Sequence, residues 1–169
     1  MMSIRAALAA ALALCFLAGS ADLAPAATIC AAATAPSPED GALLAFARRM
    51  GLAYPEAFRA IAVYLHADGG RALPGCYLRK RVAEARGWRL GGDLWAVAPG
   101  AAIGGDRFRN REGRLPPRWN SRYVEADLDY SGGHRGSHRL IFVRGMGTEW
   151  LFFVSTNHER SFAAFMPAR

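Results

Sequence analysis

Residues 123–133 read YVEADLDYSGG and carry the clearest structural signal in the chain. Apolar and acidic residues alternate along this segment: Val124, Ala126, Leu128 and Tyr130 against Glu125, Asp127 and Asp129. A period of two is typical of a strand whose two faces meet different surroundings. The Ser131-Gly132-Gly133 sequence that follows has the composition of a tight turn. We therefore predict a strand over 123–130 that pairs with the next segment as an antiparallel hairpin.

The chain downstream of this turn contains further strand-like runs. Residues 139–144 and 150–155 are apolar and flank Gly145-Met146-Gly147, which predicts a second hairpin. Residues 161–166 predict a last edge strand. The C-terminal part of the chain should therefore form an antiparallel sheet.

The chain upstream has helical periodicity instead. Ser37-Pro38-Glu39-Asp40 has the composition of a helix start. After Pro55, apolar residues recur at i, i+3, i+4 and i+7, from Phe58 to Leu65. A third short helix is predicted over 78–86, and one more helical turn over 94–98. Helices followed by strands predict an α+β fold, with N-terminal helices packed on a C-terminal antiparallel β-sheet.

The first residues of the chain have the features of a targeting segment. Arg5 precedes an uncharged run over 6–18 that is rich in Ala and Leu, and small residues follow. This pattern predicts a signal peptide over 1–27 and a secreted protein, extracellular or periplasmic, without stable membrane association after cleavage. An uncleaved anchor helix is the alternative. Residues 28–54 predict a linker and an extra N-terminal helix, and residues 55–169 the main domain.

The composition limits the classes of function that this chain can have. The 169 residues include 21 basic and 14 acidic ones, for a formal net charge of +7, which indicates a polyanionic partner or surface. Hydrophobic residues make up 52% of the chain, so it can bury a core and is not of the disordered class. Metalloprotease, P-loop and Rossmann sequence motifs are absent.

The three cysteines have neither a CxxC nor a zinc-site spacing. Cys15 would leave with the signal peptide, so Cys30 and Cys76 would remain. In an oxidising compartment such a pair predicts one disulfide bond, and two free thiols are the alternative.

Several chemically distinctive side chains converge on the predicted hairpin. Arg135 and Arg139 lie just past its turn, on the strand expected to pair with the acidic one, and His158 follows the next strand. A carboxylate such as Glu125, two guanidiniums and an imidazole suit the cleavage of RNA. The carboxylate takes the proton of the 2′-OH, the imidazolium protonates the leaving 5′-oxygen, and the arginines stabilise the phosphoryl charge. Because the 2′-OH is the nucleophile, neither a metal nor a cofactor is required. A solvated sheet face is the alternative for the carboxylates.

Over about residues 58–165 the chain resembles the bacterial guanyl-preferring ribonucleases, the barnase and binase family. The resemblance rests on separate motifs in the family's order: Leu73-Pro74, Tyr77, Lys80, Gly87-Trp88, Val97-Ala98-Pro99-Gly100, Ile103-Gly104-Gly105-Asp106, Phe108, Asn110-Arg111-Glu112-Gly113, Leu115-Pro116, Glu125-Ala126-Asp127, Arg135, Arg139 and Thr156-Asn157-His158. It implies a barnase-like fold and makes residues 55–169 a ribonuclease domain.

The resemblance also implies catalytic roles. Glu125 would be the general base and His158 the general acid. Lys80, Arg135 and Arg139 would hold the scissile phosphate. Asp106 would orient this basic cluster with help from Arg111.

A recognition loop follows from the same resemblance. Arg109, Asn110, Arg111 and Glu112 would read guanine through backbone amides and the Glu112 carboxylate. Phe108 would pack beneath this loop. His134 would touch the substrate, although an exposed loop histidine is the alternative.

The implied function is a metal-independent endoribonuclease that uses no cofactor. It would cleave single-stranded RNA, preferentially after guanine, through a 2′,3′-cyclic phosphate to a 3′-phosphate. We expect a monomer whose partners are RNA and, as the resemblance implies, an acidic barstar-like inhibitor protein. A non-catalytic, secreted cationic protein that binds RNA or a surface is the main alternative, and a membrane-active basic protein is a remoter one.

Two residues depart from the family pattern. Arg109 replaces a small residue of the recognition loop, and Glu159 stands where the family usually has a tyrosine that contacts substrate. We expect the Glu159 carboxylate to repel the RNA backbone. Alternatively, it points away and pairs with Arg160 or another surface arginine.

Overall fold

A computed structural model of the chain describes residues 36–147 and 149–166. The predicted signal peptide, residues 1–27, lies outside this described part, as do Cys15 and Cys30. In the described part, no helix is both long and apolar enough to cross a membrane.

The helices begin close to where the sequence predicts them. They are α2 (Asp40–Arg49), α3 (Pro55–Ala67) and α4 (Lys80–Ala85), with short 3-10 turns η1 (Leu94–Ala96) and η2 (Pro117–Trp119). Pro55 is the first residue of α3, a position that needs no amide donor and suits the fixed φ of proline. Phe58, Ile61 and Leu65 on this helix are fully buried, as their helical spacing predicts.

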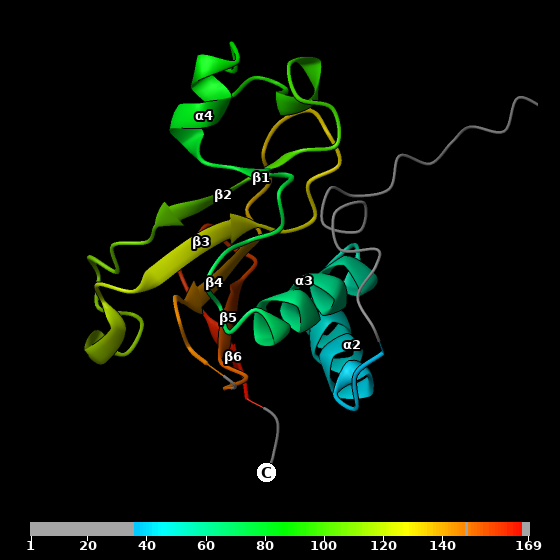
Figure 1. Ribbon diagram of the computed structural model, residues 1–169, viewed down its shortest axis with the longest axis vertical. Helices are drawn as coiled ribbons and strands as arrows, with labels where there is room; N and C mark the ends of the chain where they lie inside the picture. Colours follow the sequence, from blue (N-terminus) through cyan, green and yellow to red (C-terminus); the bar gives the residue numbers. More distant parts are fainter. Residues whose placement is uncertain (1–35, 148, 167–169) are drawn as a thin grey trace, which may run out of the picture.

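The strands form one six-stranded sheet in the order β1-β2-β3-β4-β5-β6. Their bounds are Tyr77–Leu78 (β1), Ala102–Arg107 (β2), Tyr123–Asp127 (β3), Arg139–Val143 (β4), Phe152–Ser155 (β5) and Ala163–Phe165 (β6). Strand β1 pairs with β2 in parallel, and every other neighbouring pair is antiparallel. The predicted α+β fold and the strands over β3 to β6 are confirmed (Figure 1).

Periodicity predicts no strand over 102–107, yet β2 occupies this segment. Gly104 and Gly105 lower its β-propensity, and both are required by the packing. A Cβ at Gly104 would lie 2.6 Å from a ring carbon of Tyr77, and Gly105 has a φ of +91° at a bulge opposite β3. Glycine thus permits a close approach and a bulge that bring β2 against the rest of the sheet.

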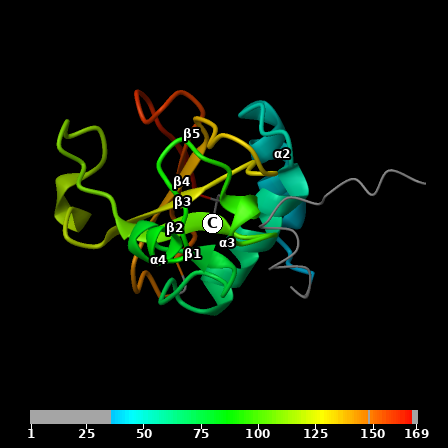
Figure 2. The ribbon, with the colours of Figure 1, turned by 90° about the horizontal axis from the view of Figure 1, so that it is seen from above.

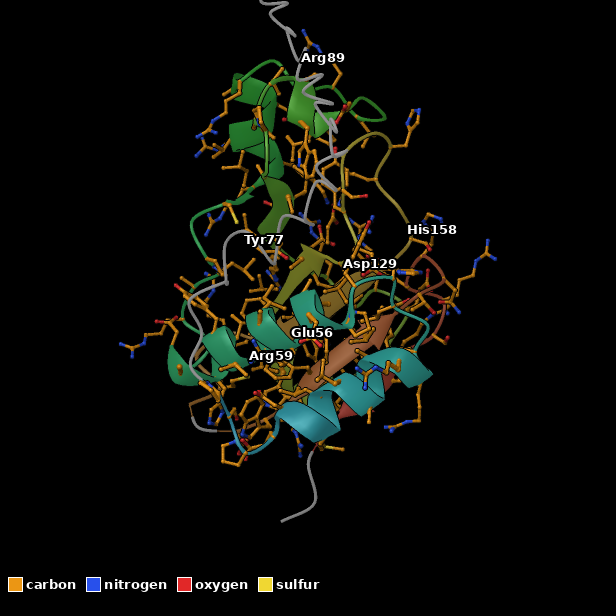
Figure 3. All side chains as sticks on the ribbon, turned by 90° about the vertical axis from the view of Figure 1, so that its right-hand side faces the viewer. Glu56, Arg59, Tyr77, Arg89, Asp129 and His158 are labelled. Atoms are coloured by element: carbon orange, nitrogen blue, oxygen red, sulfur yellow. The ribbon has the colours of Figure 1, made fainter. Side chains whose placement is uncertain are left out.

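Helices α2 and α3 stand together on one side of the strands (Figures 1 and 2). The ring of Phe46 on α2 lies 5.6 Å from that of Phe58 on α3 and 5.5 Å from that of Phe165 on β6. Arg59 on α3, labelled in Figure 3, pairs with Asp40 on α2 at 3.2 Å. The predicted extra N-terminal helix therefore shares the core of the main domain.

The predicted strand over 123–130 ends earlier, at Asp127. Asp129 has a φ of +57°, so its side chain no longer follows the alternating directions of side chains along a strand. Its carboxylate accepts hydrogen bonds from the amides of Ala53 (2.9 Å) and Tyr54 (3.0 Å), and it contacts Nδ1 of His138 at 2.6 Å. Asp129 thus fixes the start of α3 to the end of the sheet, and is not a third carboxylate beside Glu125 and Asp127.

Cys76 forms a disulfide bond. Its expected partner, Cys30, lies outside the described residues, so the Cys30–Cys76 pairing stays a prediction.

Candidate functional site

The carboxylates of β3 are buried rather than solvated. Glu125 is 9% exposed and Asp127 3%. Asp127 lies directly opposite Arg139 in the β3–β4 register, as the predicted hairpin requires. A solvated sheet face is therefore wrong for these two residues, and burial of such charges requires partners.

Asp127 is the partner of both predicted phosphate-binding arginines. Its two oxygens accept from Nε and Nη2 of Arg135 at 2.7 and 2.6 Å, and Nε of Arg139 lies 3.3 Å away. Burial lowers the pKa of Arg135, but hydrogen bonds and charge from Asp127 outweigh it and raise that pKa above its usual value. The carboxylate thereby fixes the orientation of two guanidiniums that would otherwise repel each other.

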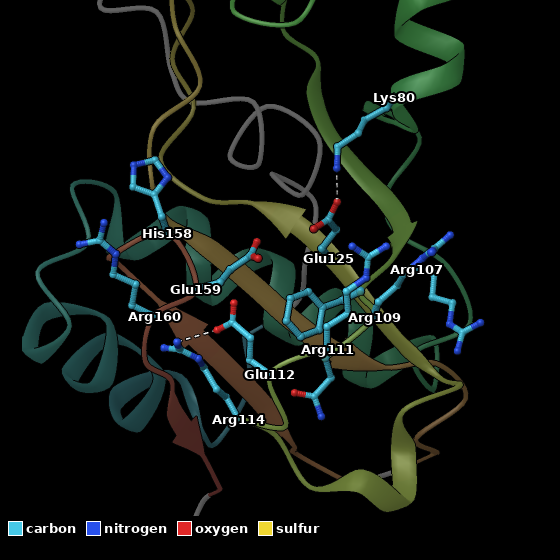
Figure 4. A pocket seen from close by; sticks show the side chains of 12 residues that line it. Lys80, Arg107, Arg109, Arg111, Glu112, Arg114, Glu125, His158, Glu159 and Arg160 are labelled. Atoms are coloured by element: carbon cyan, nitrogen blue, oxygen red, sulfur yellow. Dashed lines mark hydrogen bonds and ion pairs between the residues drawn. The ribbon is translucent and has the colours of Figure 1, made fainter.

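Lys80 and Glu125 form the second ion pair of the site. Lys80 Nζ lies 2.5 Å from Oε1 of Glu125 (Figure 4). The main-chain amide of Lys80 donates to the Asp106 carboxylate at 2.8 Å, and Asp106 stands opposite Glu125 across β2 and β3. Asp106 thus holds the backbone of Lys80, and its predicted role of orienting the basic cluster stays a prediction.

Asn110 holds the segment after β2 in its loop shape. It is buried and has a φ of +44°. Its side chain donates to the carbonyl of Leu115 at 2.8 Å and accepts from the Leu115 amide at 3.0 Å. Because these bonds occupy the side-chain amide group, Asn110 shapes the predicted recognition loop.

The loop and the sheet enclose a pocket of about 740 Å³ (Figure 4). Phe108 is in its wall and packs edge-on against Tyr123 and Phe162. Six cationic side chains and three carboxylates line the pocket, besides His158, Phe108 and Asn110: Lys80, Arg107, Arg109, Arg111, Arg114 and Arg160, with Glu112, Glu125 and Glu159. The excess of cations suits an anionic ligand.

Two titratable groups from different segments of the chain line this pocket. Glu125 enters from β3, and His158 comes from the turn after β5. The amide of His158 donates to the carbonyl of Ser137 at 3.3 Å, which ties that turn to the β3–β4 connection. A carboxylate and an imidazole around a cationic pocket can move protons on both sides of a bound phosphodiester.

Not every predicted site residue lines the pocket. Arg135 and Arg139 pair with Asp127 and are not among its lining residues, and neither is Asp106, which accepts a hydrogen bond from the amide of Lys80. His134 is exposed and near Asp93, outside the lining residues. Its contact with the substrate stays a prediction.

Two residues of the site carried no role in the sequence analysis. Asp127 shares the alternation with Glu125, and its place opposite Arg139 was the signal for an ion pair. Glu159 was singled out only as a departure, and nothing in the sequence gave its direction.

Within residues 36–147 and 149–166, no group of three or more His, Cys, Asp or Glu side chains could hold a metal ion.

Comparison with known proteins identifies relatives over the same part of the chain. A family model described as ribonuclease matches residues 64–166. A ribonuclease of Heyndrickxia coagulans is 43% identical over 94 residues, which are 55% of this chain and 83% of that protein. Ribonucleases of Bacillus intermedius and Bacillus pumilus are 42% identical over 93 residues, 54% of this chain. The match spans 55% of the length of each Bacillus protein.

Proposed function

This chain belongs to the bacterial ribonuclease family of the barnase and binase type, and from that premise we propose its reaction in detail. It is a secreted, metal-independent endoribonuclease that cleaves single-stranded RNA, preferentially after guanine. The observation that carries the proposal is the cationic pocket that both Glu125 and His158 line.

The first step is a transesterification. Glu125 takes the proton of the ribose 2′-OH, and the 2′-oxygen attacks phosphorus. The bond from phosphorus to the 5′-oxygen breaks, and His158 gives its proton to that oxygen. The products are a 2′,3′-cyclic phosphate and an RNA fragment with a free 5′-hydroxyl.

The second step hydrolyses the cyclic phosphate with the roles reversed. His158, now neutral, takes a proton from water, whose oxygen attacks phosphorus. The bond to the 2′-oxygen breaks, and protonated Glu125 returns its proton there, which leaves a 3′-phosphate. Lys80, Arg135 and Arg139 stabilise the negative charge of the phosphoryl oxygens in both steps. All groups needed for this cycle are side chains of the protein.

Treatment with excess EDTA tests this mechanism. We expect purified protein to cleave a single-stranded RNA at an unchanged rate with EDTA, and mapped products to end in a 2′,3′-cyclic phosphate and then a 3′-phosphate. Activity lost on chelation and restored by a divalent cation would contradict the metal-free mechanism. Intact RNA under all conditions would favour a non-catalytic RNA- or surface-binding protein.

Guanine preference is assigned to Glu112, and Glu112→Ala should weaken it. The carboxylate is 69% exposed and pairs with Arg114 at 2.6 Å, so a base with two adjacent donors can replace that surface pair. Loss of such a bidentate contact removes about 1–3 kcal/mol of discrimination, or roughly 5- to 150-fold. The measurement is the ratio of kcat/KM for GpA to that for ApA.

The matched control is Glu149→Ala, which removes an exposed carboxylate outside the lining residues of this pocket. It should leave the ratio unchanged. If Glu112→Ala lowered kcat/KM equally for GpA and ApA, Glu112 would support cleavage without recognising the base.

A further inference from the structure

The carboxylate of Glu159 enters the site from the turn after β5. His158 and Glu159 have φ angles of +55° and +64°, which non-glycine residues rarely adopt. The amide of Glu159 donates to Oγ of Ser155 at 2.9 Å, which fixes this turn on the end of the strand. The side chain is 32% exposed, and Oε1 lies 3.9 Å from Nε of Arg139. The alternative in which Glu159 points away toward a surface arginine is therefore wrong.

Figure 4 shows the Glu159 carboxylate directed into the pocket, toward Glu125. The charged and titratable groups around it come from several elements: Glu125 of β3, Arg139 of β4, Arg135 of the β3–β4 connection, Lys80 at the start of α4, and His158 and Arg160 of its own turn. Burial raises the pKa of Glu159, and the charge of Glu125 raises it further, against the opposing effect of the three cations Arg139, Lys80 and Arg135.

Each of these three cations also interacts with another partner. Arg139 lies closer to Asp127, at 3.3 Å, and also donates to the carbonyls of Gly136 and His138. Lys80 is paired with Glu125, and Arg135 with Asp127. Glu159 is thus an additional anion beside guanidiniums whose predicted ligand is a phosphate.

We propose that ionised Glu159 competes with the substrate phosphate for Arg139, so that Glu159 sets the affinity of the site for its anionic ligand. The inference rests on the proposed function for the identity of that ligand as a phosphodiester. When the Glu159 carboxyl is protonated, its repulsion of the phosphate disappears, and Arg139 has one fewer anion competing with the phosphoryl oxygens. Anion affinity should therefore rise as the pH falls through the pKa of Glu159.

Sulfate is the probe for this inference because its charge stays constant between about pH 4 and 8. Its dissociation constant is measured by calorimetry for wild type, Glu159→Gln and Glu149→Gln. At pH 7.5 we expect Glu159→Gln to bind sulfate about tenfold more tightly than wild type. A tenfold difference corresponds to a rise of about one unit in the pKa of Glu159 when sulfate binds. At pH 4.5 the difference between the two proteins should be clearly smaller than at pH 7.5. Glu149→Gln should match wild type throughout.

The proposal would be overturned if the sulfate dissociation constants of wild type and Glu159→Gln were equal at every pH, or if their ratio were the same at pH 4.5 and 7.5. Carboxyl NMR of wild type gives a test that needs no variant, because bound sulfate should raise the pKa of Glu159 further. A Glu159 titration that does not respond to sulfate would contradict it. In the catalytic reaction, Glu159→Gln should lower the KM for GpA about tenfold at pH 7.5. If the protein cleaves no RNA, the proposed function fails, while the sulfate experiment still decides the role of Glu159.

Discussion

Replacement of Glu125 by glutamine should lower kcat/KM for RNA cleavage by about 10²- to 10⁴-fold, the contribution of one general base. Glutamine keeps the shape of the side chain but cannot take the proton of the 2′-OH. Glu125 is 9% exposed and Lys80 Nζ lies 2.5 Å from its carboxylate, so the general base is held in a fixed position. The loss should appear in single-turnover cleavage of GpA, while RNA binding measured by fluorescence anisotropy persists.

The control for this variant is Glu149→Gln, in which an exposed carboxylate outside the pocket becomes an amide. It should retain wild-type cleavage. Thermal unfolding of both variants separates a chemical effect from loss of the fold, since Glu125 is part of a buried strand. Near-full activity in a folded Glu125→Gln protein would remove Glu125 from the proposed mechanism.

Replacement of His158 by alanine should cause a loss of similar size, about 10²- to 10⁴-fold in kcat/KM. The imidazolium is required to protonate the 5′-oxygen, so the variant should also lose the alkaline limb of the pH profile that reports deprotonation of this acid. The measurement is the kcat/KM of GpA cleavage across pH, for wild type and variant.

A substrate with a better leaving group distinguishes the acid from the base. A guanosine 3′-(p-nitrophenyl phosphate) releases a stable phenolate and needs little protonation. His158→Ala should recover most of its activity on this substrate, whereas Glu125→Gln should remain slow. Equal losses for both variants on both substrates would contradict the separate roles assigned to them.

The geometry also explains why the proposed phosphate site would be fixed before substrate arrives. Asp127 pairs with Arg135 and Arg139, and Asp106 holds the main chain of Lys80. These carboxylates lie outside the pocket lining, so their charges orient the cations without facing the ligand directly. Preorganised cations need little rearrangement when charge develops on a phosphoryl group.

Much of this arrangement was predictable from the sequence. Alternation over 123–130 predicted a strand, of which Tyr123–Asp127 forms β3. The short turn after it predicted that Arg139 returns opposite the acidic residues, and the register pairs Arg139 with Asp127. Helical spacing from Phe58 to Leu65 predicted the buried face of α3. These predictions succeed because the spacing of apolar residues indicates which side of a helix or strand is buried. The family motifs placed Glu125, His158 and the recognition loop, and the described pocket brings them together.

Only the tertiary structure decided the remaining features, because they depend on contacts between residues distant in sequence. Strand β2 contains two glycines and has little β-propensity of its own; the approach of Tyr77 requires Gly104 there. Asp129 leaves the strand alternation because amides of Ala53 and Tyr54, more than seventy positions away, offer it hydrogen bonds. The direction of Glu159 likewise depends on a left-handed turn and on Arg139 of another strand. Sequence periodicity thus determined which faces are buried, whereas packing determined which charges meet, because ion pairing depends on three-dimensional distance.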